Sequence, residues 1–405
     1  MIPAAANPFG LTPLEIACGA VFGAETRPEG QPARVEVTGA TPLAALEAAI
    51  LPALLRPPCV VSFSGGRDSS SVLAVATRLA RREGLSLPLP ATNVFPNAPA
   101  SDERAWQELV IAYLGLEDWL RIEHDDELDA VGPVAVQVLR RHGLVWPFNA
   151  HFHVPLLEAA SRGSLLTGIG GDEVFGQGRR SRAALVLGGR TRPVARDVLR
   201  VGLALSPRRV RAAVLRRRSR PPLTWLTKDA RRAAVEAWSS QAAAEPLRPA
   251  ARLAWWRRLR YVQIGIEAVD RLGAERDVSV HHPLSDLGFL TAMGRAGHAT
   301  ASLDRREAMR RVLGEALPEE LYARTTKVHF DEAFWNRHSP AFVDSWNGRG
   351  LDADVVDVEA LSRLWRSGVA VANTFTLLQA AWIGSDLARS SGADRLEQAA
   401  SGVTH

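Results

Sequence analysis

The sequence predicts an α/β fold in which a doubly wound parallel sheet is followed by a large helical part. Three observations support this prediction. Short segments rich in strand-forming residues alternate with helical stretches between residues 56 and 185. Two of these segments end in glycine-rich turns that lead into an acidic residue and a helix, and the pattern beyond residue 179 is helical. Such alternation is typical of parallel sheets that bind ligands at the carboxyl ends of their strands.

The expected elements follow from local patterns. The chain begins with a helical lead-in, with helices over residues 13–20 and 43–55, and Pro57 and Pro58 stop the second one. Ser101 is expected to cap a helix whose first turn contains Asp102 and Glu103, where acids suit the helix dipole. The other predicted elements are strands over 59–63, 91–95, 119–123 and 164–167, and helices after the first strand and over 127–141 and 154–160.

Composition excludes several classes of protein. An apolar share of 46% and a charged share of 23% over 405 residues are those of a soluble globular protein. Cys18 and Cys59 are the only cysteines, so a disulfide framework and a cysteine-built zinc site are excluded. No apolar run approaches the roughly 20 residues that span a bilayer, and no basic leader precedes residue 10. A cytoplasmic location without membrane contact is expected.

The net charge of +5 comes almost wholly from arginine, because Lys228 and Lys327 are the only lysines. Arginines cluster between Arg208 and Arg220, and such a cluster can grip tRNA or an acidic peptide. More often it is a solvated helix face, and few aromatic residues are interleaved for stacking on bases. Nucleic acid is therefore not the expected partner.

The segment from Cys59 to Ser71 predicts a phosphate cradle. A strand runs into a Ser-Gly-Gly turn, and a helix with an apolar stripe follows. The unpaired N–H groups and the dipole of a helix N-terminus attract an anion. Gly65 and Gly66 let the backbone approach phosphate oxygens, while Ser64, Ser69 and Ser70 offer hydroxyl donors. The alternative interpretation is an ordinary Ser/Gly turn at a strand end.

Two carboxylates are expected at this edge of the sheet. Asp68 beside a polyphosphate is repulsive unless a divalent cation lies between them, so we interpret it as a Mg²⁺ ligand. The fourth predicted strand ends in Thr167-Gly168-Ile169-Gly170-Gly171-Asp172-Glu173-Val174-Phe175-Gly176, where glycines again precede a carboxylate. Asp68 and Asp172 can therefore share one Mg²⁺ bound to pyrophosphate. A glycine-rich turn with a solvated Asp-Glu pair is the alternative.

The residues resemble the C-terminal synthetase domain of asparagine synthetase and its relatives, β-lactam synthetase and lasso-peptide cyclase. The resemblance rests on paired S-G-G-x-D-S and G-x-D-E-x-F motifs and covers roughly residues 56–390. Two later segments agree: 282–286 resembles the family's P-F-L-D segment, and 324–330 resembles its R-x-K segment with one extra residue. By this resemblance Lys327 is catalytic and steadies negative charge on the reacting phosphate and carbonyl.

The resemblance also implies a division of the chain and a nucleotide site. The division is a lead-in over 1–55, a synthetase domain over 56–390 with a nucleotide-binding sheet to 185 and a mostly helical part from 186, and a tail over 391–405. ATP and Mg²⁺ are the expected cofactors. Asp68 and Asp172 are the expected metal ligands, and Asp172 is also expected to be catalytic. The implied nucleotide contacts are Phe63, Val94, Thr167 and Gly168 at adenosine, Ser64, Gly65, Gly66, Asp68 and Ser69 at pyrophosphate, and Gly171 beside them.

Two departures from the family pattern bear on the product. Residues 1–55 are too short for the glutamine-hydrolysing half of asparagine synthetase, and Ile2 stands where that half exposes a catalytic cysteine. Ile169 replaces the glutamate or tyrosine that handles the amine in relatives. We therefore expect a ligase that forms an amide, releases AMP and does not hydrolyse glutamine. Its expected substrates are small molecules or peptides. A separate amidotransferase or a precursor peptide is the expected partner. Ring closure, a tRNA-modifying activity and a degenerate nucleotide-binding protein remain alternatives.

His281 and His282 form the last candidate pair. They lack a third ligand at metal spacing, so we interpret them as structural, although either ring can serve as a base. Trp225, Trp238, Trp255 and Trp256 recur at spacings expected of helix packing and are expected in the core.

Overall fold

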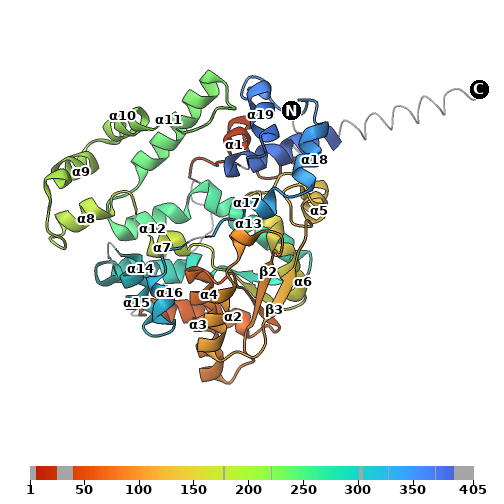
Figure 1. The fold of residues 1–405 in the computed structure, drawn as a ribbon. Helices are drawn as coiled ribbons and strands as arrows, with labels where there is room; N and C mark the ends of the chain where they lie inside the picture. Colours follow the sequence, from red (N-terminus) through yellow and green to blue (C-terminus); the bar gives the residue numbers. More distant parts are fainter. Residues whose placement is uncertain are drawn as a thin grey trace, which may run out of the picture.

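Five parallel strands form one sheet in the order β3-β2-β1-β4-β5. The structure is a computed structural model that describes residues 6–24, 40–176, 178–219, 221–300, 304–326, 328–369 and 371–386. The strands are β1 (Cys59–Ser62), β2 (Leu89–Val94), β3 (Leu120–Glu123), β4 (Ser164–Leu166) and β5 (Ser279–His281). The predicted α/β fold with a parallel sheet and a helical part is confirmed (Figure 1). β5 was not predicted, because three half-buried residues ending in a histidine carry no strand signal.

The strand order places a crossing point beside β1. The chain runs outward from β1 to β2 and β3, and it then returns to β4 on the other side of β1. Val61 pairs with Leu166 in the register of β1 and β4, so these two strands end side by side. Ligands of open α/β sheets bind at the point where the strand order reverses. The two glycine-rich segments therefore meet at this place.

Helices cover both faces of the sheet. Successive strand residues face opposite sides, so Val60 and Leu165 belong to one buried apolar cluster and Val61 and Leu166 to the other. The second cluster packs under α2 (Pro42–Leu54), α3 (Arg67–Glu83), α4 (Arg104–Leu114) and α14 (Leu287–Thr300). The first packs under α5 (Pro133–His142), α6 (Val154–Ala159) and α13 (Arg260–Ala274). This double cover makes the sheet doubly wound.

Two predicted helix starts were wrong. α4 begins at Arg104 rather than after Ser101, because Ser101 ends a short 3-10 turn and its hydroxyl donates to the carbonyl of Ala98 at 2.7 Å. α5 begins at Pro133 rather than at residue 127. The carboxylate of buried Asp129 accepts from the backbone N–H of Val131 at 2.9 Å, and this contact holds the chain in a turn before the helix.

The N-terminal helices are built into the rest of the molecule. In α1 (Pro13–Cys18), Thr12 and Glu15 form a reciprocal capping box. The second carboxylate oxygen of Glu15 accepts from Arg260 of α13 at 2.7 Å, and the indole N–H of Trp225 donates to the carbonyl of Ala17 at 2.7 Å. The lead-in is thus attached to the helical part. Both cysteines are free and buried, and burial raises the pKa of the Cys18 thiol to about 12.

An arm of helices extends from the body at the upper left of Figure 1. It comprises α8 (Ser181–Leu187), α9 (Ala195–Leu205), α10 (Arg208–Arg218) and α11 (Lys228–Ala244). α10 has no buried residue, and Arg216 pairs with Glu236 of α11 at 2.5 Å. The described arginines of α10 therefore lie at the surface, except Arg211, which is partly buried and donates to the carbonyl of Ala243 at 3.0 Å. Among the described residues, no helix combines the length and apolar character needed to cross a membrane.

The remaining helices complete the body around the sheet edge. They are α7 (Gly171–Phe175), α12 (Pro249–Arg257), α15 (Arg305–Leu313), α16 (Glu319–Ala323), α17 (Asp331–Phe334), α18 (His338–Ser345), α19 (Val358–Arg366) and an unlabelled helix over 375–386. Trp225 and Trp256 are buried, as expected of core residues. Trp238 and Trp255 are only partly buried, and both line a cavity beside α7.

Candidate active site

The predicted cradle lies between β1 and α3. Gly66 is the N-cap of α3, and Gly65 has a φ of +80°, where a Cβ would lie 2.7 Å from the Cγ of Gln107. Glycine is therefore required at position 65 both for its backbone conformation and for space. The hydroxyls of Ser64 and Ser69 lie 3.0 Å apart, and Ser69 also donates to the carbonyl of Gly66 at 3.2 Å. These contacts fix the turn around the helix N-terminus.

The second glycine-rich segment packs directly against the first. A Cβ on Gly168 would lie 2.9 Å from the backbone nitrogen of Ser69, and a Cβ on Gly171 would lie 2.2 Å from the Cγ of Asp68. Real Cβ atoms do not make contacts that short. The glycines thus let α7 approach α3 closely enough for Asp172 to lie beside Asp68.

We expect Gly171→Ala to separate the two carboxylates. The added methyl group has no space beside Asp68, so α7 must move, at a cost of about 1–3 kcal/mol of overpacking. The expected result is a clear loss of Mg²⁺-dependent ATP binding, measured by titration calorimetry. Gly202→Ala in α9 is the matched control, because nothing lies within 4 Å of a Cβ there. Equal binding by both variants would contradict the close packing of α7 on α3.

Arg305 bridges the two carboxylates. Its Nη2 donates to Asp68 Oδ1 at 2.5 Å, and its Nη1 donates to Asp172 Oδ1. Burial raises the pKa of Asp68, although the charge of Arg305 opposes that shift. Asp172 is exposed. One cationic group therefore already interacts with both acids.

This arrangement fits a Mg²⁺ ion. Two carboxylates that converge on one guanidinium can converge on a divalent cation, and Mg²⁺ in phosphate sites commonly takes only one or two carboxylates. The described residues contain no cluster of three or more histidine, cysteine or acidic side chains that would form an all-protein metal cage. The Nε of Arg305 is buried without a hydrogen-bond partner among the described residues. A phosphate oxygen can satisfy such a donor.

A buried ion pair between Arg324 and Glu103 contacts the cradle. Arg324 and Glu103 are 7% and 4% exposed, and two nitrogens of the guanidinium donate to the two carboxylate oxygens. Arg324 also donates to the carbonyl of Gly65 at 3.2 Å and lies over the ring of Trp106 at 4.9 Å. Glu103 lies at the start of α4 as its N-cap, but its carboxylate pairs with Arg324 and makes no hydrogen bond to the helix N-terminus. This pair links the R-x-K-like segment to the cradle.

Three cavities meet around these residues. The phosphate cavity, of about 330 Å³, is lined by Ser64, Gly66, Asp68, Ser69 and Asp172, and by Arg67, Arg305 and Arg324. The aromatic cavity, of about 210 Å³, is lined by Phe63, Asn93, Phe95, Phe152 and Phe330 among others. Ser64, Glu103 and Phe330 line both. A ligand with a planar ring and a polyphosphate can therefore span the two.

The third cavity, here called the acceptor cavity, has a volume of about 510 Å³ and lies beside α7. Asp172 lines it as well as the phosphate cavity. Glu173, Trp256 and Tyr261 form part of its wall, and the indole N–H of Trp256 donates to the hydroxyl of Tyr261 at 2.9 Å. Burial raises the pKa of Glu173, and the negative charge of Asp172 adds to that effect.

Some predicted contacts lie elsewhere. Val94 does not line the aromatic cavity, whereas Asn93 and Phe95 on either side of it do. Thr167 and Gly168 do not line it either. The hydroxyl of Thr167 hydrogen-bonds Nδ1 of His282 at 2.7 Å, and Gly168 packs on Ser69. Lys327 lies outside the described residues, but Thr326 and Val328 line the phosphate cavity.

The interpretation of the histidine pair as structural agrees with its contacts. Nε2 of His282 lies 3.2 Å from Asp270 Oδ1, so both ring nitrogens have partners. Nε2 of His281 lies 3.0 Å from the hydroxyl of Ser279. Among the described residues, sequence reasoning missed Arg305 and Arg67. Arg67 occupies the variable position of S-G-G-x-D-S, where the motif requires no particular side chain, and Arg305 stands in no motif, so an arginine-rich chain offers no signal that separates them from solvated arginines.

Comparison with known families agrees with the motifs. A family model described as asparagine synthase matches residues 47–383. This range begins within α2 and ends within the helix over 375–386, so it contains all five described strands and both glycine-rich segments. Comparison with curated protein sequences gives no match.

Proposed function

The chain belongs to the asparagine synthase family, and from this premise we propose that it adenylates a carboxylate with ATP and transfers the acyl group to an amine. The family is one of ATP-dependent ligases that form carbon–nitrogen bonds. The observation that carries the proposal is the convergence of Asp68 and Asp172 on one cationic group at the helix N-terminus of the cradle. AMP and pyrophosphate are the expected nucleotide products.

The cavities support a specific arrangement of ATP. The adenine would lie in the aromatic cavity, where Phe95 and Phe152 stack with ring centroids 5.4 Å apart. The β- and γ-phosphates would lie at the N-terminus of α3, where the dipole and free N–H groups attract anions. Arg67, Arg305 and Arg324 line the same cavity and oppose the phosphate charge. The α-phosphate then lies where the two cavities join.

Asp68 and Asp172 would hold Mg²⁺, with phosphate oxygens and water completing its coordination. When bound, the ion neutralises charge on the leaving pyrophosphate. Arg305 must then leave at least one carboxylate. Its guanidinium is close enough to donate to a phosphate instead, with a geometry that suits bidentate binding.

Two transfers complete the proposed reaction. An oxygen of the substrate carboxylate attacks the α-phosphorus, and the bond to the β-phosphate oxygen breaks, so pyrophosphate leaves. The amine nitrogen then attacks the acyl carbon, a proton leaves the nitrogen, and the bond between the acyl carbon and the phosphate oxygen breaks to release AMP. The cradle and the arginines would hold the phosphates in line for the first transfer, which is the main contribution a protein makes to such a step.

A second, narrower proposal is ring closure, in which one molecule supplies both the carboxylate and the amine. Ile169 cannot handle a proton, and in relatives that position carries the group that serves the incoming amine. The acceptor cavity of about 510 Å³ also exceeds what ammonia or a free amino acid needs. Both observations favour an amine that a larger substrate holds in place.

We expect Asp68→Asn to impair catalysis more than nucleotide binding. The neutral amide occupies the same space but cannot offset the charge of a magnesium ion bound to pyrophosphate. ATP affinity should change by less than the rate of pyrophosphate exchange, which should fall roughly 10²-fold or more. The measurement is exchange across a magnesium titration. Exchange rates that match the wild type at every magnesium concentration would contradict the assignment.

The experiment that tests the function is carboxylate-dependent exchange of labelled pyrophosphate into ATP. The acids are aspartate, glutamate and synthetic peptides with internal Asp or Glu, each with and without magnesium. Exchange that requires one of these acids supports adenylation. Exchange that appears only with added tRNA would favour an RNA-modifying enzyme, and ATP binding without any exchange would favour a non-catalytic nucleotide-binding protein.

A further inference from the structure

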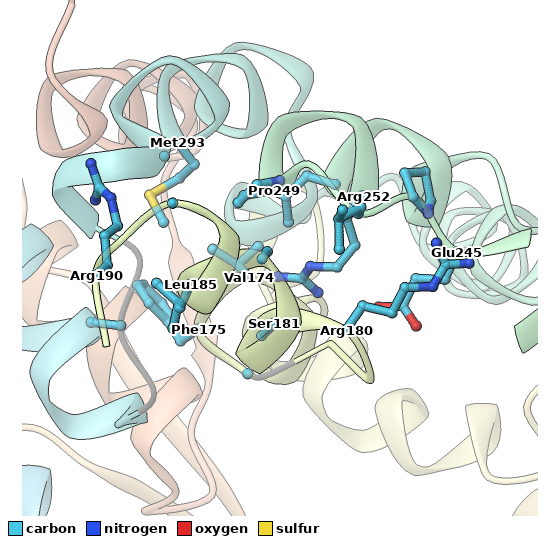
Figure 2. A pocket seen from close by; sticks show the side chains of 18 residues that line it. Val174, Phe175, Arg180, Ser181, Leu185, Arg190, Glu245, Pro249, Arg252 and Met293 are labelled. Carbon is cyan, nitrogen blue, oxygen red and sulfur yellow. The ribbon is translucent and has the colours of Figure 1, made fainter. Parts of the chain in front are cut away.

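A fourth cavity, smaller than the other three, adjoins the acceptor cavity. This side pocket has a volume of about 90 Å³ and shares Gly176, Glu245 and Arg252 with the acceptor cavity. Its walls come from α7, α8, α12, α14 and α15 (Figure 2). The acceptor cavity in turn shares Asp172 with the phosphate cavity. The phosphate cavity, the acceptor cavity and the side pocket therefore follow one another from the cradle to the base of the helical arm.

The side pocket has an apolar middle and charged ends. Its apolar wall consists of Val174, Phe175, Leu185, Leu253 and Met293. Figure 2 shows Arg190 at one end and Glu245 at the other, with Arg180 and Arg252 near Glu245. Burial raises the pKa of Glu245, while the positive charges of Arg252 and Arg180 oppose the shift. At this end the two guanidinium groups of Arg180 and Arg252 outnumber the one carboxylate of Glu245 and leave a net positive charge.

Two glycines and an alanine keep the pocket open. Ala184 lines it from α8, Gly188 from the turn that follows α8, and Gly297 from α14. A Cβ on Gly297 would make an ordinary contact of 3.7 Å with Cβ of Pro249, so glycine is not required there by backbone packing. A larger residue at 297 would reduce the pocket rather than strain the fold.

On the premise that the proposed ligase activity is correct, we propose that the substrate is a peptide and that an apolar side chain remote from its reacting carboxylate binds in the side pocket. The phosphate cavity and the side pocket share no lining residue, so a ligand that occupies both must run through the acceptor cavity between them. An extended chain can follow the acceptor cavity, with its partly buried Trp238 and Trp255, and place one side chain among Val174, Leu185 and Met293. The surrounding arginines suit a peptide with further carboxylates.

The test is selection from a peptide library by the immobilised full-length protein. The library consists of synthetic octapeptides with one fixed Asp and seven random positions, applied with magnesium and α,β-methylene-ATP, which cannot be cut at the α-phosphate. We expect enrichment of Leu, Met or Phe at one position. Burial of such a side chain is worth roughly a tenfold or greater gain in affinity over alanine.

Gly297→Leu should remove that enrichment while leaving the nucleotide affinity and the melting temperature unchanged. Gly202→Leu, a helical glycine in α9 with nothing within 4 Å of its Cβ, is the matched control and should select as the wild type does. Ala184→Leu fills the pocket from α8 and replaces Gly297→Leu if that variant fails to fold.

The possible results separate this inference from the proposed function. No preference at any position, or the same preference in Gly297→Leu, would overturn the side pocket as a subsite. Pyrophosphate exchange with free aspartate or glutamate but with no peptide would overturn the peptide substrate and leave the ligase intact. Pocket-dependent selection without exchange for any acid would instead uphold peptide binding and refute the ligase.

Discussion

Replacing Arg324 by methionine should lower the free energy of unfolding by about 3–5 kcal/mol, because it leaves the carboxylate of Glu103 buried without its partner. The substitution also removes the donor to the carbonyl of Gly65 and the contact with Trp106. The loss of stability should therefore include the cradle itself. Urea denaturation followed by circular dichroism measures the change.

Two comparisons isolate the buried pair. Arg311→Met removes one member of an exposed pair with Glu307, whose side chains are 41% and 50% exposed, and should cost less than about 0.5 kcal/mol. The double variant Arg324→Met with Glu103→Gln should recover part of the loss, since no charge remains buried. A single Arg324→Met variant within about 1 kcal/mol of the wild type would show that the pair is not enclosed as the fold implies.

Replacing Lys327 by alanine should abolish measurable carboxylate-dependent pyrophosphate exchange and leave ATP binding nearly intact. The family resemblance implies that this ammonium group would steady charge developing on phosphate and carbonyl oxygen together. Removal of such a preorganised charge costs about 3–4 kcal/mol of transition-state stabilisation, or two to three decades in rate. Lys327→Arg should rescue poorly, because a planar guanidinium does not replace a compact ammonium group.

The only other lysine provides the control. Lys228 is the exposed first residue of α11, so Lys228→Ala removes the same charge away from the cavities and should exchange as the wild type does. ATP affinity of both variants is measured by calorimetry under the same conditions. Full exchange activity in Lys327→Ala would refute the catalytic role expected of this lysine.

Local sequence determined the strands and the motifs of this protein. The first four strands lie within two residues of their predicted bounds, because runs of strand-forming residues and the turns after them are local signals. The segments 62–68 and 167–172 were predicted to share one edge of the sheet, since parallel strands followed by helices carry their ligands at their carboxyl ends. The structure places Asp68 and Asp172 on one cationic partner, in agreement with that argument.

The tertiary structure alone decided which residues join these motifs. Arg305 and Asp68 are 237 positions apart, and Arg324 and Glu103 are 221 apart, so no periodicity or spacing along the chain pairs them. The close contact of Gly171 with Asp68 depends on β4 lying beside β1, and β5 exists only because the chain returns to that edge. Local sequence patterns indicate the secondary structure of a segment. These contacts depend instead on which strands and helices become neighbours in the folded molecule. The packing of helices around that sheet brings Arg305 of α15 to the two acids and encloses the side pocket.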